Sequence, residues 1–71
     1  MNDELLIYPN PVTDILNITK EIDIKLYDMV GNLVISKEKT TNIDMTNLPS
    51  GIYNLSITYN NEIINNRIIK Q

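Results

Sequence analysis

The sequence of 71 residues contains no cysteine and no histidine. These absences exclude disulfide bonds, thiolate and imidazole metal ligands, cysteine nucleophiles and histidine general bases. Carboxylates, hydroxyl groups and lysines remain, and most of the nine acidic residues adjoin turns or occupy solvent-facing strand positions. We therefore expect a protein that is not an enzyme, with no catalytic residues, no metal and no cofactor.

Long apolar runs and excess positive charge are also missing. The longest apolar runs, Leu5–Ile7 and Leu33–Ile35, have three residues, whereas a membrane span needs about 20. Six Lys and Arg stand against nine Asp and Glu, giving a net charge of −3 and no basic surface for a nucleic acid. The segment Met1–Glu4 is acidic, so we expect no membrane span, no nucleic-acid partner and no signal peptide within the chain.

The apolar residues that are present favour β structure. Ile, Val, Thr and Tyr account for 26 of the residues, with thirteen Ile, while Ala does not occur. β-branched and aromatic residues are enriched in strands, and Ala is the best helix former. At this length one hydrophobic core is expected, so we interpret residues 1–71 as a single domain.

Two segments alternate apolar and polar residues with the period of a half-buried strand. They are Ile22–Asp28 and Tyr53–Tyr59, and the alternation predicts which side chains face inward. The expected inward residues are Ile22, Ile24 and Leu26 in the first strand, and Tyr53, Leu55, Ile57 and Tyr59 in the second.

Short turn signals separate these strands from further apolar segments. Gly31 within Met29–Asn32 leads directly into Leu33–Ile35, which predicts a hairpin. Asn60 and Asn61 separate the second strand from Glu62–Lys70, and Asn tolerates left-handed backbone. This pattern predicts a second hairpin.

Three shorter candidate strands complete the count: Leu5–Tyr8, Asp14–Thr19 and Asn42–Met45. With them the chain has about seven strands and a turn signal every 8–12 residues. We therefore predict an all-β fold, a small immunoglobulin-like antiparallel β-sandwich of about seven strands.

Two proline-containing segments are typical of rigid turns. Tyr8–Pro11 places two prolines around Asn10, which predicts a structural corner. Leu48–Tyr53 is a tight turn with Gly51 suited to positive φ. It resembles the tyrosine corner of immunoglobulin-like sandwiches, in which a Tyr hydroxyl bonds to the backbone a few residues upstream.

Two further patterns carry little functional weight. Asn42, Asp44 and Thr46 are expected on one strand face and offer oxygen atoms, but the acids, central Gly and closing Glu of an EF-hand loop are missing. Asn17–Thr19 and Asn54–Ser56 match the glycosylation sequon, which a chain with eleven Asn produces by chance.

Four segments in order resemble one known family. Tyr8–Asp14, Tyr27–Val34, Leu48–Tyr53 and Arg67–Lys70 resemble the type A C-terminal sorting domain of the type IX (Por) secretion system of Bacteroidetes. The resemblance covers essentially the whole chain. It implies sorting-motif roles for Pro9, Asn10, Pro11, Gly31, Leu48, Gly51, Tyr53, Arg67, Ile68, Ile69 and Lys70.

The resemblance implies a secretion signal rather than an active protein. Such a domain follows an N-terminal cargo domain that enters the periplasm with its own signal peptide. The secretion machinery recognises it and moves the cargo across the outer membrane, and a sortase-like surface protease removes it for cell-surface attachment or release. The chain would then be a module excised from a larger secreted protein, with Met1 added as a start. Gln71 after Lys70 departs from the family pattern, and Met1–Leu5 is too short to show a cleavage region.

The last predicted strand, Glu62–Lys70, is expected at a sheet edge, where a receptor could add a strand. Arg67 and Lys70 are expected to present exposed positive charge on an otherwise acidic chain. The same edge could pair with a second copy, giving a weak homodimer.

The alternative function is a small immunoglobulin-like accessory module of a secreted enzyme that binds carbohydrate or protein. A carbohydrate-binding face needs exposed aromatic side chains. The sequence has no Trp or Phe, and two of its four Tyr, Tyr53 and Tyr59, are expected to point inward. The alternative is therefore the weaker hypothesis.

Overall fold

The computed structural model describes residues 4–71 and consists of strands joined by turns. The strands are β1 (Ile7–Tyr8), β2 (Ile15–Tyr27), β3 (Leu33–Asp44), β4 (Gly51–Tyr59) and β5 (Glu62–Lys70). They form one antiparallel sheet in the order β1-β2-β4-β5, with β3 along the other side of β2. Within the described residues there is no helix suited to crossing a membrane.

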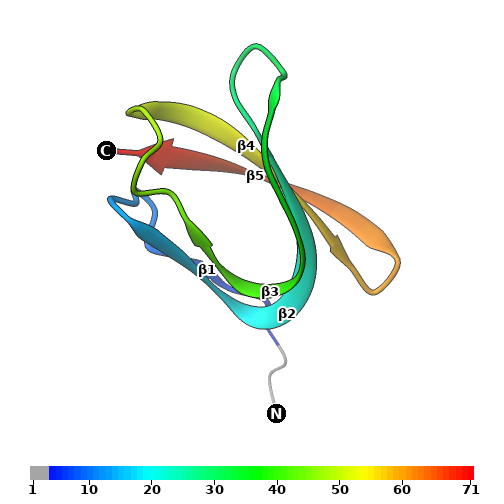
Figure 1. Cartoon of the computed structure of the whole chain (residues 1–71). Coiled ribbons are helices and arrows are strands. Elements are labelled where there is room, and N and C mark those ends of the chain that lie inside the picture. Colours follow the sequence, from blue (N-terminus) through cyan, green and yellow to red (C-terminus); the bar gives the residue numbers. More distant parts are fainter. Residues whose placement is uncertain (1–3) are drawn as a thin grey trace.

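The sheet curls over on itself and thereby encloses its own core. Figure 1 shows β2 and β3 bending together through the middle of the molecule, so that β1 and the start of β2 lie opposite the β4–β5 hairpin. The pairing of β2 with β3 contains register shifts after Asn17, Ile22 and Leu26. Such bulges increase local twist and bend a strand, which explains how one sheet supplies both walls of the core.

The prediction of an all-β antiparallel fold is confirmed, whereas the seven-strand immunoglobulin-like sandwich is not. Two pairs of predicted strands are joined into single long strands. Asp14–Thr19 and Ile22–Asp28 fall within or beside β2, and Leu33–Ile35 and Asn42–Met45 are the two ends of β3. Charged residues in mid-strand, such as Lys20 and Glu21, resemble loops in sequence, yet here the extended strand continues through the bend, although its pairing with β3 is interrupted between Asn17 and Ile22.

β2 keeps one alternation across the bend. Its even-numbered residues from Leu16 to Leu26 face inward, and all of them are buried apart from half-buried Lys20. Ile24 pairs with Lys37 and Ile22 pairs with Thr40, so two residues of β3 lie opposite the single residue Asp23. One of these two, Lys39, has a positive φ of 49°. The backbone N–H of Lys39 donates to the Asp23 carboxylate over 3.0 Å, which holds this bulge.

The core lies between the two walls of the curled sheet. Both strands predicted from strict alternation face it as expected: Ile22, Ile24, Leu26, Tyr53, Leu55 and Ile57 are buried, and Tyr59 is half-buried against the same cluster. The core also contains residues from less regular segments, namely Val12, Leu16, Ile18, Ile43, Met45 and Ile68.

Both predicted hairpins are present. Asn60 and Asn61, with φ of 52° and 63°, connect β4 to β5. These are the left-handed values that a two-residue hairpin turn needs. Gly31 has a φ of 98° in the turn between β2 and β3.

Candidate functional site

The corner between β1 and β2 runs beside the end of β5. The Val12 N–H donates to the Ile69 carbonyl over 2.8 Å, and the Gln71 N–H donates to the Val12 carbonyl over 2.9 Å. Val12 and Lys70 thus form a parallel bridge. A segment near the start of the chain therefore covers the outer edge of its last strand.

The side chain of Asn10 extends this pairing by two residues. Its Nδ2 donates to the Arg67 carbonyl over 2.9 Å, and its Oδ1 accepts from the Ile69 N–H over 2.9 Å. We call these two hydrogen bonds the Asn10 clamp. A primary amide offers a donor and an acceptor side by side, as a peptide group does. Pro9 and Pro11 have no backbone N–H to donate, so the Asn10 side chain makes the hydrogen bonds that the backbone of a strand residue would otherwise make.

The predicted tyrosine corner is on the other side of the same β5 segment. Gly51, Ile52 and Tyr53 pair with Lys70, Ile69 and Ile68, respectively. The buried Tyr53 hydroxyl donates to the Pro49 carbonyl over 2.7 Å, as the sequence predicts. Gly51 opens β4 with a φ of 155°, and half-buried Leu48 packs against the core.

Three of the four sequence motifs therefore meet at one end of the molecule. The order across this end is the corner Pro9–Val12, then Arg67–Lys70 of β5, then Gly51–Tyr53 of β4. Figure 1 shows this end where the blue corner lies near the red C-terminal strand. Gly31 lies in the turn between β2 and β3, and Figure 1 shows this hairpin projecting beyond the neighbouring strands.

The motif residues at this end divide into exposed and buried sets. Ile68, Tyr53 and Lys70 are buried, whereas Gly51 is exposed together with six further residues. These six, which we call the motif surface, are Pro9, Asn10, Pro11, Ile52, Arg67 and Ile69.

The prediction that Lys70 presents exposed charge is wrong. Its side chain is only 7% exposed, because it follows Ile68 on the inward face of β5, and its Nζ donates to the Gln71 backbone oxygen over 3.0 Å. A lysine can bury its alkyl chain while its ammonium group finds a polar partner at the margin. Arg67, on the opposite face, is exposed as expected.

β5 lies at one end of the strand order β1-β2-β4-β5, but its C-terminal part is not a free edge. Asn10 and Val12 occupy the backbone groups of Arg67, Ile69 and Gln71. Alternate residues of an antiparallel strand present their backbone groups to the same side. The part of this edge that no described segment covers is therefore residues 62–66.

Comparison with known proteins identifies the chain. The family described as secretion system C-terminal sorting domains matches residues 6–71. The chain belongs to this family. Beta-agarase D of Zobellia galactanivorans is 36% identical to it over 59 residues, which cover 79% of this chain and 12% of that protein. The present chain thus corresponds to a small fraction of the curated relative that it matches.

This sorting domain is a C-terminal secretion signal of the type IX secretion system. It directs secretion across the outer membrane to the cell surface or beyond, and its family is in general non-catalytic. The resemblance carried by the four sequence motifs is thereby confirmed.

Two acidic residues of the sorting domain hold turns, a role that the sequence reasoning missed. The Asp28 carboxylate accepts from the N–H groups of Asn32 and Val30 and from the Asn32 side-chain amide, over 2.9, 3.0 and 3.2 Å. The hydrogen bond from the Asn32 backbone contributes most to lowering the pKa of Asp28. An Asp before a Gly-containing turn is the signal that predicts this role.

Asp44 has the same role at the end of β3. Its Oδ1 accepts from the Thr46 hydroxyl over 2.6 Å and from the Thr46 N–H over 3.0 Å. Both hydrogen bonds lower the pKa of Asp44, and the bond from the Thr46 hydroxyl contributes most. Thr46 lies in the turn after the strand, so the expectation that Asn42, Asp44 and Thr46 share one strand face is wrong. Within residues 4–71 no group of three or more acids is arranged to hold a metal ion.

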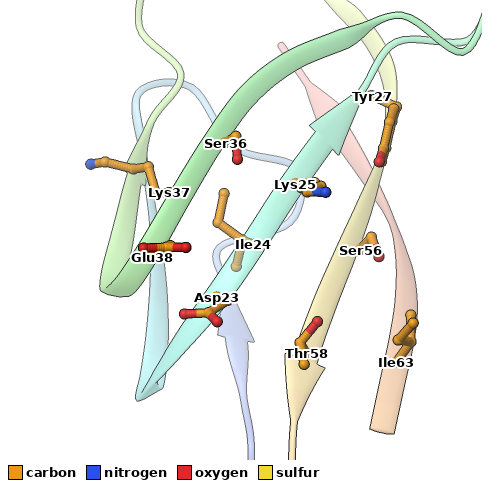
Figure 2. A pocket seen from close by; sticks show the side chains of 10 residues that line it. All are labelled: Asp23, Ile24, Lys25, Tyr27, Ser36, Lys37, Glu38, Ser56, Thr58 and Ile63. Atoms are coloured by element: carbon orange, nitrogen blue, oxygen red, sulfur yellow. The ribbon is translucent and has the colours of Figure 1, made fainter. Parts of the chain in front are cut away.

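A shallow groove of about 410 Å³ crosses the outer face of the sheet. Figure 2 shows Lys25 and Tyr27 of β2 beside Ser56 and Thr58 of β4, with Ile63 of β5 at the margin. Tyr27 is the single aromatic among the ten lining residues and is half-buried. Polar side chains are usual on the solvated face of an antiparallel sheet, so the groove gives the carbohydrate-binding alternative no aromatic platform.

Proposed function

We propose that this chain is one folded, non-catalytic module of a longer secreted protein, with its cargo on the N-terminal side. The match to 12% of a curated relative supports a module rather than a whole enzyme. The lack of Cys and His, together with the use of Asp28 and Asp44 as turn acceptors, supports the absence of catalysis.

The secretion machinery recognises the motif surface. The observation that carries this proposal is the Asn10 clamp, because it joins the corner and the last strand, 57 and 59 residues apart in sequence, into one surface. A preformed surface loses little conformational freedom on binding. The receptor therefore reads a folded arrangement of Asn10, Arg67, Ile69 and Ile52 rather than a linear tail.

Removal by a sortase-like protease takes place before Glu4. The Thr19 hydroxyl donates to the Glu4 carbonyl over 3.1 Å and accepts from the Leu6 N–H over 2.8 Å, and the Thr19 N–H donates to the Leu6 carbonyl. Hydrogen-bonded backbone is a poor protease substrate, which disfavours a cut within the segment that these bonds hold. The expected start residue Met1 lies outside the described residues.

A weak homodimer would form through the uncovered edge at residues 62–66, since Asn10 and Val12 block the rest of β5. Sedimentation at rising protein concentration tests this state.

An export assay tests recognition of the motif surface. The 71 residues are fused behind a signal peptide and a fluorescent reporter in a bacterium with a type IX system. The motif-surface variant combines Arg67→Ser with Ile69→Ser, and the matched control variant combines Ile63→Ser with Asn65→Ser. Both pairs are exposed on the same face of β5, but only the first lies in the motif surface.

The motif-surface variant should accumulate reporter in the periplasm, with export reduced at least about ten-fold, as loss of two central contacts would produce. The matched variant should export normally, and both should keep the wild-type melting temperature. Equal export by the two variants would remove the motif surface as the recognition site. Failure of the wild-type fusion to export would remove the sorting function itself.

A further inference from the structure

The tip of the β2–β3 hairpin exposes apolar side chains that the fold does not bury. Val30 is 86% exposed, Met29 59% and Leu33 53%. We call these three residues the hairpin tip. Isolated exposed apolar residues are ordinary, whereas three of them on one projecting turn favour an interaction site.

The turn itself does not need these residues. The Gly31 N–H donates to the Asp28 carbonyl over 3.1 Å, and the Asp28 N–H donates to the Asn32 carbonyl over 3.0 Å. The Asp28 carboxylate and the positive φ of Gly31 complete the turn. Its central positions favour small polar residues, and β-branched Val is unusual there. Turn geometry therefore explains Asp28, Gly31 and Asn32, and leaves Met29 and Val30 unexplained.

The same hydrogen bonds fix the backbone of the turn that carries the hairpin tip. Asp28 binds both the backbone and the side chain of Asn32 as well as the backbone of Val30. Side chains displayed on a fixed turn lose less conformational entropy on binding than those on a mobile loop. The tip has the properties of an anchor that inserts into a preformed pocket.

We propose that the hairpin tip inserts into an apolar pocket with a basic rim on a protein component of the secretion machinery. This inference rests on the proposed function and adds a contact made by the hairpin itself. The base of the hairpin adjoins the motif surface, because Tyr27 pairs with Asn54 and Asn54 pairs with Arg67. Residues 27–33 contain Asp28 but no Lys or Arg, so the charge beside the apolar group is negative. A pocket that receives it gains from positive charge at its rim.

Charge also argues against two other candidate partners of the hairpin tip, a membrane surface and a second copy of the chain. A membrane surface attracts basic rather than acidic segments, and here a carboxylate adjoins Met29 in a chain of net charge −3. A second copy of the chain carries the same acidic tip and the same net charge. A protein pocket with a basic rim is therefore the best match.

The test replaces the apolar tip without disturbing the turn. Met29→Ser, Val30→Ser and Leu33→Ser are combined in one variant of the export fusion, and Asp28, Gly31 and Asn32 are kept. The matched control combines Met29→Leu, Val30→Ile and Leu33→Met, which keeps the tip apolar. Ile63→Ser controls for loss of an equally exposed apolar residue elsewhere, since Ile63 is 71% exposed.

The polar tip should reduce export at least about ten-fold at an unchanged melting temperature, while both controls export like the wild type. Adding Asp28→Asn to the apolar control, with the melting temperature measured alongside, removes the negative charge and should also reduce export. Export equal to that of the apolar control would overturn the basic rim. Normal export by the polar tip, with export lost on mutation of the motif surface, would overturn this inference and leave the proposed function standing. No export by the wild type would overturn both.

Two binding measurements separate the remaining occupants. The purified chain is floated with vesicles of phosphatidylethanolamine and a minor share of phosphatidylglycerol, and its mass is measured by sedimentation. We expect no vesicle binding and no dimer that depends on the hairpin tip. Tip-dependent binding to the vesicles would assign the tip to a lipid surface, and a tip-dependent dimer would assign it to a second copy; either result overturns the proposal.

Discussion

Replacement of Asn10 tests the physical basis of the motif surface. Asn10→Ala removes both hydrogen bonds of the clamp, to the Arg67 carbonyl and the Ile69 N–H. A typical intramolecular hydrogen bond contributes about 0.5–1.5 kcal/mol net. Both bonds are at the surface, so water replaces the lost partners and the lower part of that range applies. We expect a loss of about 1–1.5 kcal/mol in the free energy of unfolding.

Asn10→Asp separates the donor from the acceptor at constant shape. The aspartate still accepts from the Ile69 N–H, but a carboxylate oxygen replaces the donor that faces the Arg67 carbonyl 2.9 Å away. The charged form is disfavoured there, which raises the pKa of the introduced carboxyl group in the folded state. We expect Asn10→Asp to be less stable than wild type at neutral pH and to recover below about pH 4, where the protonated acid can donate.

Thermal and urea unfolding followed by circular dichroism measure these changes. For a domain of this size, about 1 kcal/mol corresponds to about 4–8 °C in melting temperature. Hydrogen exchange adds a local measurement, because the Ile69 amide should lose protection in Asn10→Ala. Asn65→Ala, an exposed asparagine of the same strand outside the clamp, should change stability by less than about 0.5 kcal/mol. If Asn10→Ala behaves like Asn65→Ala and the Ile69 amide stays protected, the clamp does not hold β5.

Three further predictions concern the turns. Tyr53→Phe, which removes the hydroxyl bonded to Pro49, should cost about 1 kcal/mol in urea unfolding; an unchanged midpoint would contradict the tyrosine corner. Gly31→Ala should lower the free energy of unfolding by about 1 kcal/mol or more. The cause is the φ of 98° alone, since no atom lies within 4 Å of the added Cβ. Gly31→Asn should recover part of this loss, and an Ala variant as stable as wild type would refute the prediction. The pKa values of Asp28 and Asp44 are lower in the folded state, so both carboxylates stabilise the fold above their unfolded pKa and lose this effect as the pH falls through the folded value. Urea midpoints should therefore drop below about pH 4, and less so when both residues are Asn; identical pH profiles would contradict this.

The sequence by itself determined those features that depend on neighbouring residues. Alternation fixed the inward faces of the strands that contain Ile24 and Leu55, because side chains of a strand point to opposite faces in turn. Gly31 and the pair Asn60–Asn61 marked both hairpins, because positive φ is available at low cost to few residue types. The Tyr53 hydrogen bond was also predictable, since its partner lies only four residues upstream.

Only the tertiary structure decided the features that depend on residues far apart in the chain. The polar middle of β2 looks like a loop until the bend and its partner β3 are known, so two strands were expected where one exists. Lys70 looks like an exposed charge until its place beside Ile68 on the inward face is known. The clamp joins Asn10 to residues 57 and 59 positions away; its hydrogen bonds form only after the sheet has curled, because that curvature brings the corner beside β5.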